Sequence, residues 1–327
     1  MSGFSRLDVA AHERTRAHIK PPNIDFLHAR ALRRAYVRGS FVQARSGGLS
    51  VRKYDIRFLA AATAVIGALG LTASQAGAGD TVGVLVLKEH GVGSAAQAQP
   101  YVEKFVNMAA KQNGWSAAKG QYHTTRANAD AFISSDKPHY GILSLAAFLD
   151  YKGKHSVEVI GQASVARAGG QQYYLVSKSA SDLAGCKGKA LASDHADDAK
   201  FIEKVVAKGS FKLGDFTLTK TTRPVQTLKK VITDEAVCAL IDDAQLAELG
   251  KLEGGSAVKS VWSSDKLPPM VVVAFPSAPT AEKKGFQASL GKLCEGDGKA
   301  ACTEVGIQSL KSAGASDYAT VIAAYEK

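Results

Sequence analysis

The stretch Thr-Val-Gly-Val-Leu-Val-Leu at residues 81–87 decides how the chain folds. It is a continuous apolar run of strand length, which is typical of a strand buried on both faces of a sheet. In residues 97–111, the side chains of Tyr101 and Phe105 fall on one face of a helix, and Gly114 marks its end. The sequence therefore predicts a strand followed by an amphipathic helix at the start of a globular region.

The alternation of strands and helices continues to the end of the chain. Further strands are expected at residues 120–125, 139–143, 157–166, 172–177, 189–192, 216–222, 236–241, 260–262 and 270–274. Helices are expected at residues 127–134, 145–151, 197–208, 225–232, 243–249, 281–293, 300–313 and 318–325. Strands that are separated by helices indicate an α/β fold with mainly parallel sheets.

The composition is that of a folded chain with an ordinary surface charge. Of the 327 residues, 46% are hydrophobic and 22% are charged, which excludes wholesale disorder, and the length favours about two domains. The formal net charge of +11 is mostly N-terminal, because residues 1–50 contain nine Lys or Arg and three Asp or Glu. Residues 79–327 contain 29 basic and 26 acidic residues, so we expect no nucleic-acid partner.

Residues 51–78 have the three parts of a secretory signal peptide. A basic stretch precedes an apolar run at 58–73, and Ala76-x-Ala78 predicts cleavage before Gly79. A transmembrane anchor is the alternative, but a membrane span needs about 20 apolar residues and this run is shorter. We therefore expect a protein that is exported to the periplasm.

Residues 1–50 precede this signal peptide, although a signal peptide should begin the protein that it exports. They are rich in Arg and lack strong hydrophobic periodicity. We interpret them as a non-native N-terminal extension, with translation starting at Val51. The globular region that carries the function then begins after residue 78.

All four cysteines, Cys186, Cys238, Cys294 and Cys302, follow the expected cleavage point. An even number in an oxidising compartment indicates two disulfides, for which three connectivities are possible. The segment 294–302 encloses a Gly-rich turn, which favours local pairing of its two cysteines and leaves Cys186 with Cys238. Zinc binding is the alternative, but no CxxC motif or nearby His pair supports it.

Motifs for catalysis and for cofactor binding are weak. The GxGxxA pattern at 91–96 is that of a dinucleotide fingerprint, but the next strand ends at 124–126 without the acidic residue that would hold a ribose. Ser193-Asp194-His195 contains the residue types of a catalytic triad, yet neighbours in one loop cannot form its geometry. The region contains no P-loop, GxSxG or HExxH motif. We therefore expect no enzyme, no cofactor and no metal.

Four segments stand out by their order along the chain. They are HYGILSLAAFL at 139–149, GQQYYLVSK and SDLAGCKGK within 170–189, a helix and strand at 225–243 that end in VCALIDD, and VWSSDKLPPMVVV at 261–273. Each motif alone identifies a protein family only weakly, but the order and spacing of all four identify it more specifically. From about residue 81 to the C-terminus, the chain resembles the solute-binding proteins of phosphate/phosphonate-type ABC transporters.

The resemblance implies the type 2 periplasmic binding fold. In this fold two α/β lobes, each a mainly parallel sheet flanked by helices, are joined by two crossover strands, here near 167–175 and 267–275. Lobe 1 would comprise residues 79–170 and 275–327, and lobe 2 residues 171–274. A small molecule would bind in the cleft between the lobes and pass to an ABC permease at the inner membrane. The protein is expected to act as a monomer.

Ligands of such folds face the loops and helix N-termini at the C-terminal ends of the strands. In this sequence the positions are Lys88, His90, Thr124, Thr125, Arg126, Ser144, Ser193, Asp194, His195, Arg223 and Asp242, with Glu89 beside them. The resemblance favours Thr125, Ser144, Ser193 and Asp242 among these. We predict that this set binds the ligand.

The loop at 192–198 departs from the family pattern. Phosphonate binders place Ser, Thr and Gly here to hold the anion, whereas this loop contains Asp194, Asp197 and Asp198. Their carboxylates would repel an anion, although helix capping is the alternative role for Asp197 and Asp198. A neutral, zwitterionic, cationic or largely apolar ligand is therefore as plausible. An exported protein for a lipid or apolar ligand, or a sensor subunit, is the alternative function, and the missing motifs disfavour an exported enzyme.

Overall fold

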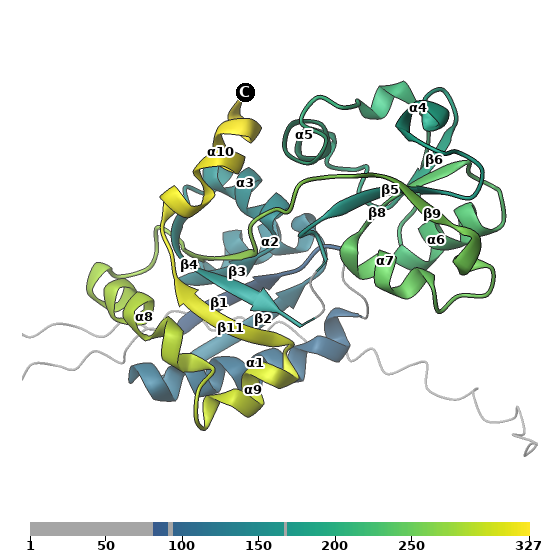
Figure 1. Ribbon diagram of the computed structural model, residues 1–327. Coiled ribbons are helices and arrows are strands. Elements are labelled where there is room, and N and C mark those ends of the chain that lie inside the picture. Colours follow the sequence, from purple (N-terminus) through teal and green to yellow (C-terminus); the bar gives the residue numbers. More distant parts are fainter. Residues whose placement is uncertain (1–80, 91–93, 167–168) are drawn as a thin grey trace, which may run out of the picture. The chain divides into compact units, whose positions relative to one another are not determined.

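Two β-sheets, each flanked by helices, organise the chain in the computed structural model (Figure 1). The structure describes residues 81–90, 94–166 and 169–327. The expected extension and signal peptide at 1–78 lie outside the described residues, as do the glycines of the 91–93 loop. In the described ranges, no helix has both the length and the apolar character needed to cross a membrane.

The first sheet combines strands from both ends of the described chain. Its spatial order is β11-β4-β10-β3-β1-β2. β1 pairs in parallel with β2 and β3, whereas β10 and β11 make antiparallel pairs. The bounds are β1 Val82–Leu87, β2 Ala118–His123, β3 Tyr140–Leu143, β4 Glu158–Val165, β10 Met270–Ala274 and β11 Ile307–Ser312. This sheet is the centre of lobe 1.

The second sheet is built from the middle of the chain. Its order is β7-β6-β8-β5-β9, with β6 parallel to both β7 and β8 and with β5 antiparallel to β8 and β9. The bounds are β5 Tyr173–Ser177, β6 Ala190–Ser193, β7 Thr217–Lys220, β8 Cys238–Asp242 and β9 Lys259–Ser263. This sheet is the centre of lobe 2.

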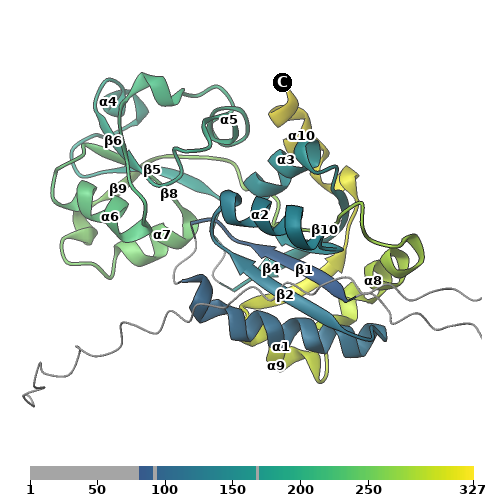
Figure 2. The ribbon, with the colours of Figure 1, turned by 180° about the vertical axis from the view of Figure 1, so that it is seen from behind.

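Helices cover both faces of the first sheet (Figures 1 and 2). One face carries α1 Ala95–Asn113, α8 Thr280–Leu293 and α9 Gly298–Glu304. The other carries α2 Arg126–Asp136, α3 Leu145–Lys154 and α10 Ala319–Glu326. In lobe 2 the helices are α4 Leu183–Cys186, α5 Ala199–Phe201 with a π-helical continuation at Ile202–Val206, α6 Pro224–Ile232 and α7 Asp243–Leu249.

The position of β1 between two layers of helices explains why its sequence is apolar without interruption. Val82 and Val84 pack into the core under α1 and α8, while Leu85 and Leu87 pack into the core on the opposite face. All four side chains are buried. Because successive side chains of a strand point to opposite faces, a strand with helices on both sides needs an apolar residue at every position. The predicted strand is confirmed.

Two short connections carry the chain between the sheets. The first runs from β4 to β5 and the second from β9 to β10, and they are hydrogen-bonded to each other. The Leu267 amide donates to the Gln171 carbonyl at 2.7 Å, and the Ser264 amide donates to the Tyr173 carbonyl at 2.8 Å. This arrangement confirms the two-lobed α/β architecture with two crossovers.

Three of the differences from the sequence-based expectation bear on the architecture. The sheets are mixed rather than mainly parallel, because each crossover brings back a strand that runs against its neighbours. β10 pairs with β3 and β4, so the return to lobe 1 comes between β9 and β10, a few residues before the expected boundary at residue 275. The helix expected at 300–313 ends early, because Gly306 adopts a left-handed φ of 78° and β11 then covers the edge of β4.

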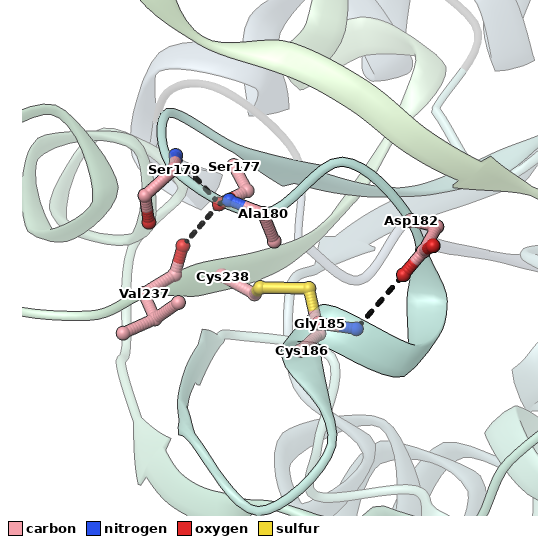
Figure 3. Close-up of a disulfide and its surroundings, with 8 residues drawn as sticks. All are labelled: Ser177, Ser179, Ala180, Asp182, Gly185, Cys186, Val237 and Cys238. Atoms are coloured by element: carbon pink, nitrogen blue, oxygen red, sulfur yellow. Dashed lines mark hydrogen bonds between the residues drawn. A yellow bond between two sulfur atoms is a disulfide. The ribbon is translucent and has the colours of Figure 1, made fainter.

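The Cys186–Cys238 disulfide joins the end of α4 to the start of β8 (Figure 3). Both cysteines are fully buried. Beside it, the Ser177 hydroxyl donates to the Val237 carbonyl at 2.6 Å and accepts the Ala180 amide at 3.0 Å. The bridge therefore anchors the connection from β5 to β6 against the central strand of the second sheet.

The Cys294–Cys302 disulfide closes the turn between α8 and α9. Together the two bridges use all four cysteines, and no free cysteine remains in the described residues. Both pairings are those that the sequence favoured among the three connectivities. The short bridge constrains a local turn, whereas the long one connects elements that are 52 residues apart.

Removing the two bridges separately should cost different amounts of stability. Closing the longer loop lowers the conformational entropy of the unfolded chain and so raises its free energy by about 4 kcal/mol. The shorter loop raises it by about 3 kcal/mol. The double variant Cys186→Ala/Cys238→Ala should therefore lower the free energy of unfolding by more than Cys294→Ala/Cys302→Ala, as measured by urea denaturation. Equal losses, or four alkylatable thiols in protein that has not been treated with a reducing agent, would contradict this prediction.

Candidate functional site

The predicted site residues follow the C-terminal ends of strands in both sheets. Residues 88–90 follow β1, 124–126 follow β2, and Ser144 follows β3. In lobe 2, Ser193 is the last residue of β6, Asp194 and His195 follow it, and Asp242 is the last residue of β8. Because parallel strands end at the same edge of a sheet, each lobe gathers its polar loops at one edge.

These loops line two cavities that share Glu89 and His90 in their walls. The larger is a groove of about 1070 Å³, and the smaller is a cavity of about 40 Å³. The groove walls include Thr124, Thr125, Arg126, Ser193, Asp194 and Arg223, and the smaller cavity is lined by Lys88, Ser144, His195 and Asp242. All eleven predicted residues therefore meet at these cavities, and their contact with a ligand stays a prediction.

Several hydroxyls that the family resemblance assigns to the ligand have partners inside the protein. Thr125 and Ser144 are the N-cap residues of α2 and α3, and their hydroxyls accept backbone amides three residues along. The Ser193 hydroxyl donates to the Leu240 carbonyl at 3.0 Å and accepts the His195 amide at 3.0 Å. These groups shape the walls of the groove and stabilise its loops.

Arg126 is bound by carboxylates from both lobes. Its Nε lies 2.8 Å from Glu89 Oε1, and its Nη2 lies 2.5 Å from Asp198 Oδ2. Asp150 lies 3.6 Å from Nη1. Burial by itself would lower the pKa of Arg126, but the Glu89 and Asp198 carboxylates outweigh it and raise that pKa. The guanidinium is therefore fully charged and already paired.

Glu89 is held in the groove wall by two donors. Besides Arg126, the Ser144 hydroxyl donates to its carboxylate at 3.0 Å. Burial raises the pKa of Glu89, and the charge of Arg126 works against that rise. Asp198 has a second role, because its other carboxylate oxygen accepts the Phe201 amide at the start of α5. The capping role that the sequence allowed for Asp198 is thus present together with the ion pair.

Asp194 is buried in lobe 2 and points its two oxygens into different surroundings. Oδ1 accepts the Thr227 hydroxyl at 2.8 Å and the Gln245 side-chain amide at 2.9 Å. Oδ2 is buried and has no hydrogen-bond partner in the described part of the chain. Its neighbour His90 has Nδ1 at 3.7 Å, beyond hydrogen-bonding distance. One face of a buried carboxylate is therefore left without a donor.

Two histidines from different lobes meet beside this carboxylate. The rings of His90 and His195 have centroids 4.4 Å apart, and Tyr173 packs edge-on against His195. Burial, followed by the neighbouring His195, lowers the pKa of His90 to about 4, although Asp194 and Asp197 oppose the shift. One ligand atom from each of His90, Asp194 and His195 lies within 4.8 Å of the others, so this group could hold a metal ion.

Lys88 and Asp242 line the smaller cavity with opposite charges. Burial lowers the pKa of Lys88, and the Asp242 and Asp243 carboxylates oppose that shift. Burial raises the pKa of Asp242, against the effect of His195. Asp242 also caps α7, where its Oδ1 accepts the Gln245 amide at 2.9 Å. Asp242 therefore both caps α7 and lines the smaller cavity.

Sequence reasoning missed three residues that organise the site. Gln245 connects Asp194, His195 and Asp242 through its side-chain amide, and Thr227 binds Asp194 from α6. The capping-box spacing from Asp242 to Gln245 was a signal for the first, since the third helical residue reaches back to the cap. No sequence pattern marked Thr227 or Tyr173, because their contacts depend on how α6 and β5 pack.

No family model matches the chain, and no curated protein matches it in sequence. Solved structures match its fold. A Xanthomonas citri protein bound to ATP has a TM-score of 0.60 at 7% identity, over 75% of this chain and 98% of its own. PhnD1 from Prochlorococcus marinus, solved with methylphosphonate, has a TM-score of 0.56 at 9% identity, over 75% and 97%.

A binding protein component of an ABC phosphonate transporter from Pseudomonas aeruginosa has a TM-score of 0.53 at 16% identity, over 72% of this chain and 82% of its own. These likenesses confirm the type 2 periplasmic binding fold that the sequence resemblance implied. At such low identities they describe the fold, and the chemistry of the groove has to be argued from its own residues.

Acid should destabilise the folded protein partly through His90. The unfolded chain takes up a proton on this residue near pH 6.5, whereas the folded chain does so only near pH 4. Stability is therefore lost as the pH falls through this window, by up to about 1.4 kcal/mol per pH unit. In His90→Gln this loss should be absent, so the wild type should lose about 2 kcal/mol more than the variant between pH 6.5 and 4.5.

The measurement is urea denaturation of chelator-treated protein at a series of pH values. Glu89 and Asp242 have raised pKa values and act in the opposite direction, because the folded chain binds their protons first. Both proteins keep these groups, so the difference between the two curves isolates His90. Parallel curves would show that the His90 ring does not stay neutral in the folded protein.

Proposed function

We propose that the chain is the periplasmic solute-binding component of an ABC-type transporter. It would bind one small molecule between its lobes, deliver it to a permease at the inner membrane, and act as a monomer without covalent chemistry. The observation that carries this proposal is the groove of about 1070 Å³, whose walls come from strand ends of both sheets. A ligand that contacts both walls would stabilise the arrangement in which they face each other.

The lobes already contact each other across the groove in this structure. Arg126 of α2 binds Asp198 at the start of α5, and Lys200 lies 4.2 Å from the ring centroid of Tyr325 in α10. The two crossover connections lie side by side and are short, so they can act as a hinge. These features support a protein whose lobes open and close around a ligand.

The lining of the groove favours a polar ligand over a lipid. Its acidic and basic side chains include Glu89, Asp194, Asp197, Asp198, Arg126, Lys220 and Arg223. Thr124, Thr125, Thr221 and Thr222 add hydroxyls. An apolar ligand would have to desolvate these groups without replacing their hydrogen bonds. This argues against the alternative of a lipid or apolar ligand.

The charge balance of the groove disfavours a phosphate-like dianion. Four carboxylates stand against three cationic side chains, and the most buried of those cations, Arg126, is already paired with Glu89 and Asp198. An incoming dianion would have to displace a carboxylate or leave it unpaired, and breaking one partner of a buried ion pair is costly. We therefore propose a neutral, zwitterionic or cationic ligand.

Retention of a ligand tests the solute-binding role directly. Protein purified gently from the periplasm should carry one small molecule per chain in native mass spectrometry, and should become more compact in small-angle scattering when that molecule is returned to the emptied protein. Thr222→Trp, which fills the groove at an exposed position, should weaken this binding at least tenfold. Thr303→Trp, an exposed threonine of α9 outside the groove, is the matched control.

Equal ligand loss in the two tryptophan variants would place the binding site elsewhere. Chemical conversion of the retained molecule by the purified protein would show that the chain is an enzyme. Failure to retain any molecule, together with no thermal stabilisation by the small molecules of a periplasmic extract, would overturn the solute-binding role.

A second experiment tests whether the groove excludes anions. It removes the carboxylates that are paired with Arg126, so that this side chain becomes free to bind an anion. The wild type should show no thermal stabilisation with millimolar inorganic phosphate or methylphosphonate, although a ligand at 100 times its Kd stabilises by about 2.7 kcal/mol. Glu89→Gln/Asp198→Ser removes the two closest carboxylates and should permit measurable methylphosphonate binding. Asp182→Ser is the control, because it makes the same Asp-to-Ser change at a helix cap in lobe 2 and leaves Arg126 paired. Tight phosphonate binding by the wild type would contradict the exclusion.

A further inference from the structure

His90, Asp194 and His195 form a three-residue group between the groove and the smaller cavity, with one member from lobe 1 and two from lobe 2. One ligand atom from each lies within 4.8 Å of the other two. His90 Nδ1 and Asp194 Oδ2, which come from opposite lobes, are 3.7 Å apart. Two ligands on a tetrahedral zinc ion are about 3.4 Å apart, so small side-chain movements would bring this group into coordination.

The carboxylate of Asp194 is the part of the group that points most directly to a cation. Only 1% of its side chain is exposed, and Oδ2 has no hydrogen-bond partner in the described residues. Its partners on the other oxygen, Thr227 and Gln245, are neutral. Within the described ranges, no Lys or Arg lies within ion-pair distance of it. A buried charge with an unpaired oxygen is costly unless a cation or a donor occupies the space beside it.

The surrounding residues prepare both imidazoles to act as ligands. The Gln245 side-chain oxygen accepts the Asp242 amide at 3.0 Å, and its nitrogen donates to Asp194, so the orientation of this amide is determined. His195 Nε2 lies 2.8 Å from that oxygen and must donate to it, which leaves the lone pair on Nδ1. This is the outer-shell arrangement that orients metal-binding histidines.

His90 has a corresponding arrangement on its own ring. Nδ1 faces the unpaired oxygen of Asp194, and Nε2 lies 3.9 Å from a carboxylate oxygen of Asp197. A metal ion on Nδ1 would place the proton on Nε2, toward that carboxylate. Asp197 is exposed and makes no hydrogen bond to a helix amide in the described structure. Its role would be to accept the Nε2 proton of His90 and so orient the ring.

The geometry points to a divalent transition-metal site at His90, Asp194 and His195, with at least one coordination position open to the groove. Two imidazoles and one carboxylate suit Zn²⁺ and its neighbours in the first transition row better than Mg²⁺ or Ca²⁺. Because the ligands come from both lobes, the ion would hold them together. This inference rests on the proposed solute-binding role and names the ligand class of the same groove, a metal ion with water or a small molecule in the open position.

Titration of the chelator-treated protein with Zn²⁺ and Co²⁺ tests the site. Calorimetry should show one ion per chain, with no binding of Mg²⁺ or Ca²⁺ at the same concentrations, and Co²⁺ should give a visible absorption spectrum typical of low coordination number. His90→Ala, His195→Ala and Asp194→Asn should each weaken Zn²⁺ binding at least 100-fold. Gln245→Met should weaken it by about 10–100-fold through loss of the outer shell. His155→Ala, which removes a histidine paired with Asp130 outside the groove, is the matched control.

Each outcome can be assigned. Absence of stoichiometric binding, or equal affinity in the wild type and the three ligand variants, overturns the metal site. If that happens while the wild type still retains an organic molecule, the solute-binding role stands without the metal. If Zn²⁺ binds with the expected variant pattern but the protein retains no organic molecule and none from a periplasmic extract stabilises it, the metal site stands and the proposed delivery of a small organic solute fails. Circular dichroism of each variant excludes misfolding, and Asp194→Asn keeps the shape of the native side chain.

Discussion

The sharing of one guanidinium by carboxylates from both lobes is the interaction on which the groove depends. Arg126 binds Glu89 of its own lobe and Asp198 of the other, at 2.8 and 2.5 Å. Removing either carboxylate would leave a partly buried cation short of a partner, which is far more costly than losing a surface ion pair. The pair therefore sets how the lobes meet, and it also removes the most buried cation of the groove from the reach of an anionic ligand.

The remaining polar groups of the groove follow from the same need to satisfy buried charge. Asp242 is balanced by the N-terminus of α7, and one oxygen of Asp194 is satisfied by Thr227 and Gln245. The other oxygen of Asp194 is not satisfied within the described chain, and it faces an imidazole of the opposite lobe. The fold is shared with proteins solved with ATP and with methylphosphonate, so the fold by itself does not fix the ligand, and the ligand chemistry is inferred from these side chains.

Much of the fold could be read from local patterns, and the failures have a common cause. β1 was predictable because burial on both faces demands an apolar residue at every position. The segment 307–312 was wrongly expected to be helical, because Ile307 and Leu310 are spaced as well for a helix as for an irregular strand. Only the exposed edge of β4, which lies more than 140 residues earlier, makes the strand favourable. Tertiary pairing decided between two local structures of similar propensity.

For the site, the sequence alone predicted which residues lie at the groove and the smaller cavity, because the ends of parallel strands gather at one edge whatever the side chains are. It also favoured the correct disulfide pairing, since a Gly-rich turn brings Cys294 close to Cys302. Only the tertiary structure decided which of these polar groups are free to bind a ligand and which already have a partner inside the protein. Arg126 is paired and one oxygen of Asp194 is not, because these contacts join segments that are 37 to 104 residues apart and depend on how two lobes pack. The local sequence thus indicates the candidate site residues, and long-range packing determines which partners each of them has.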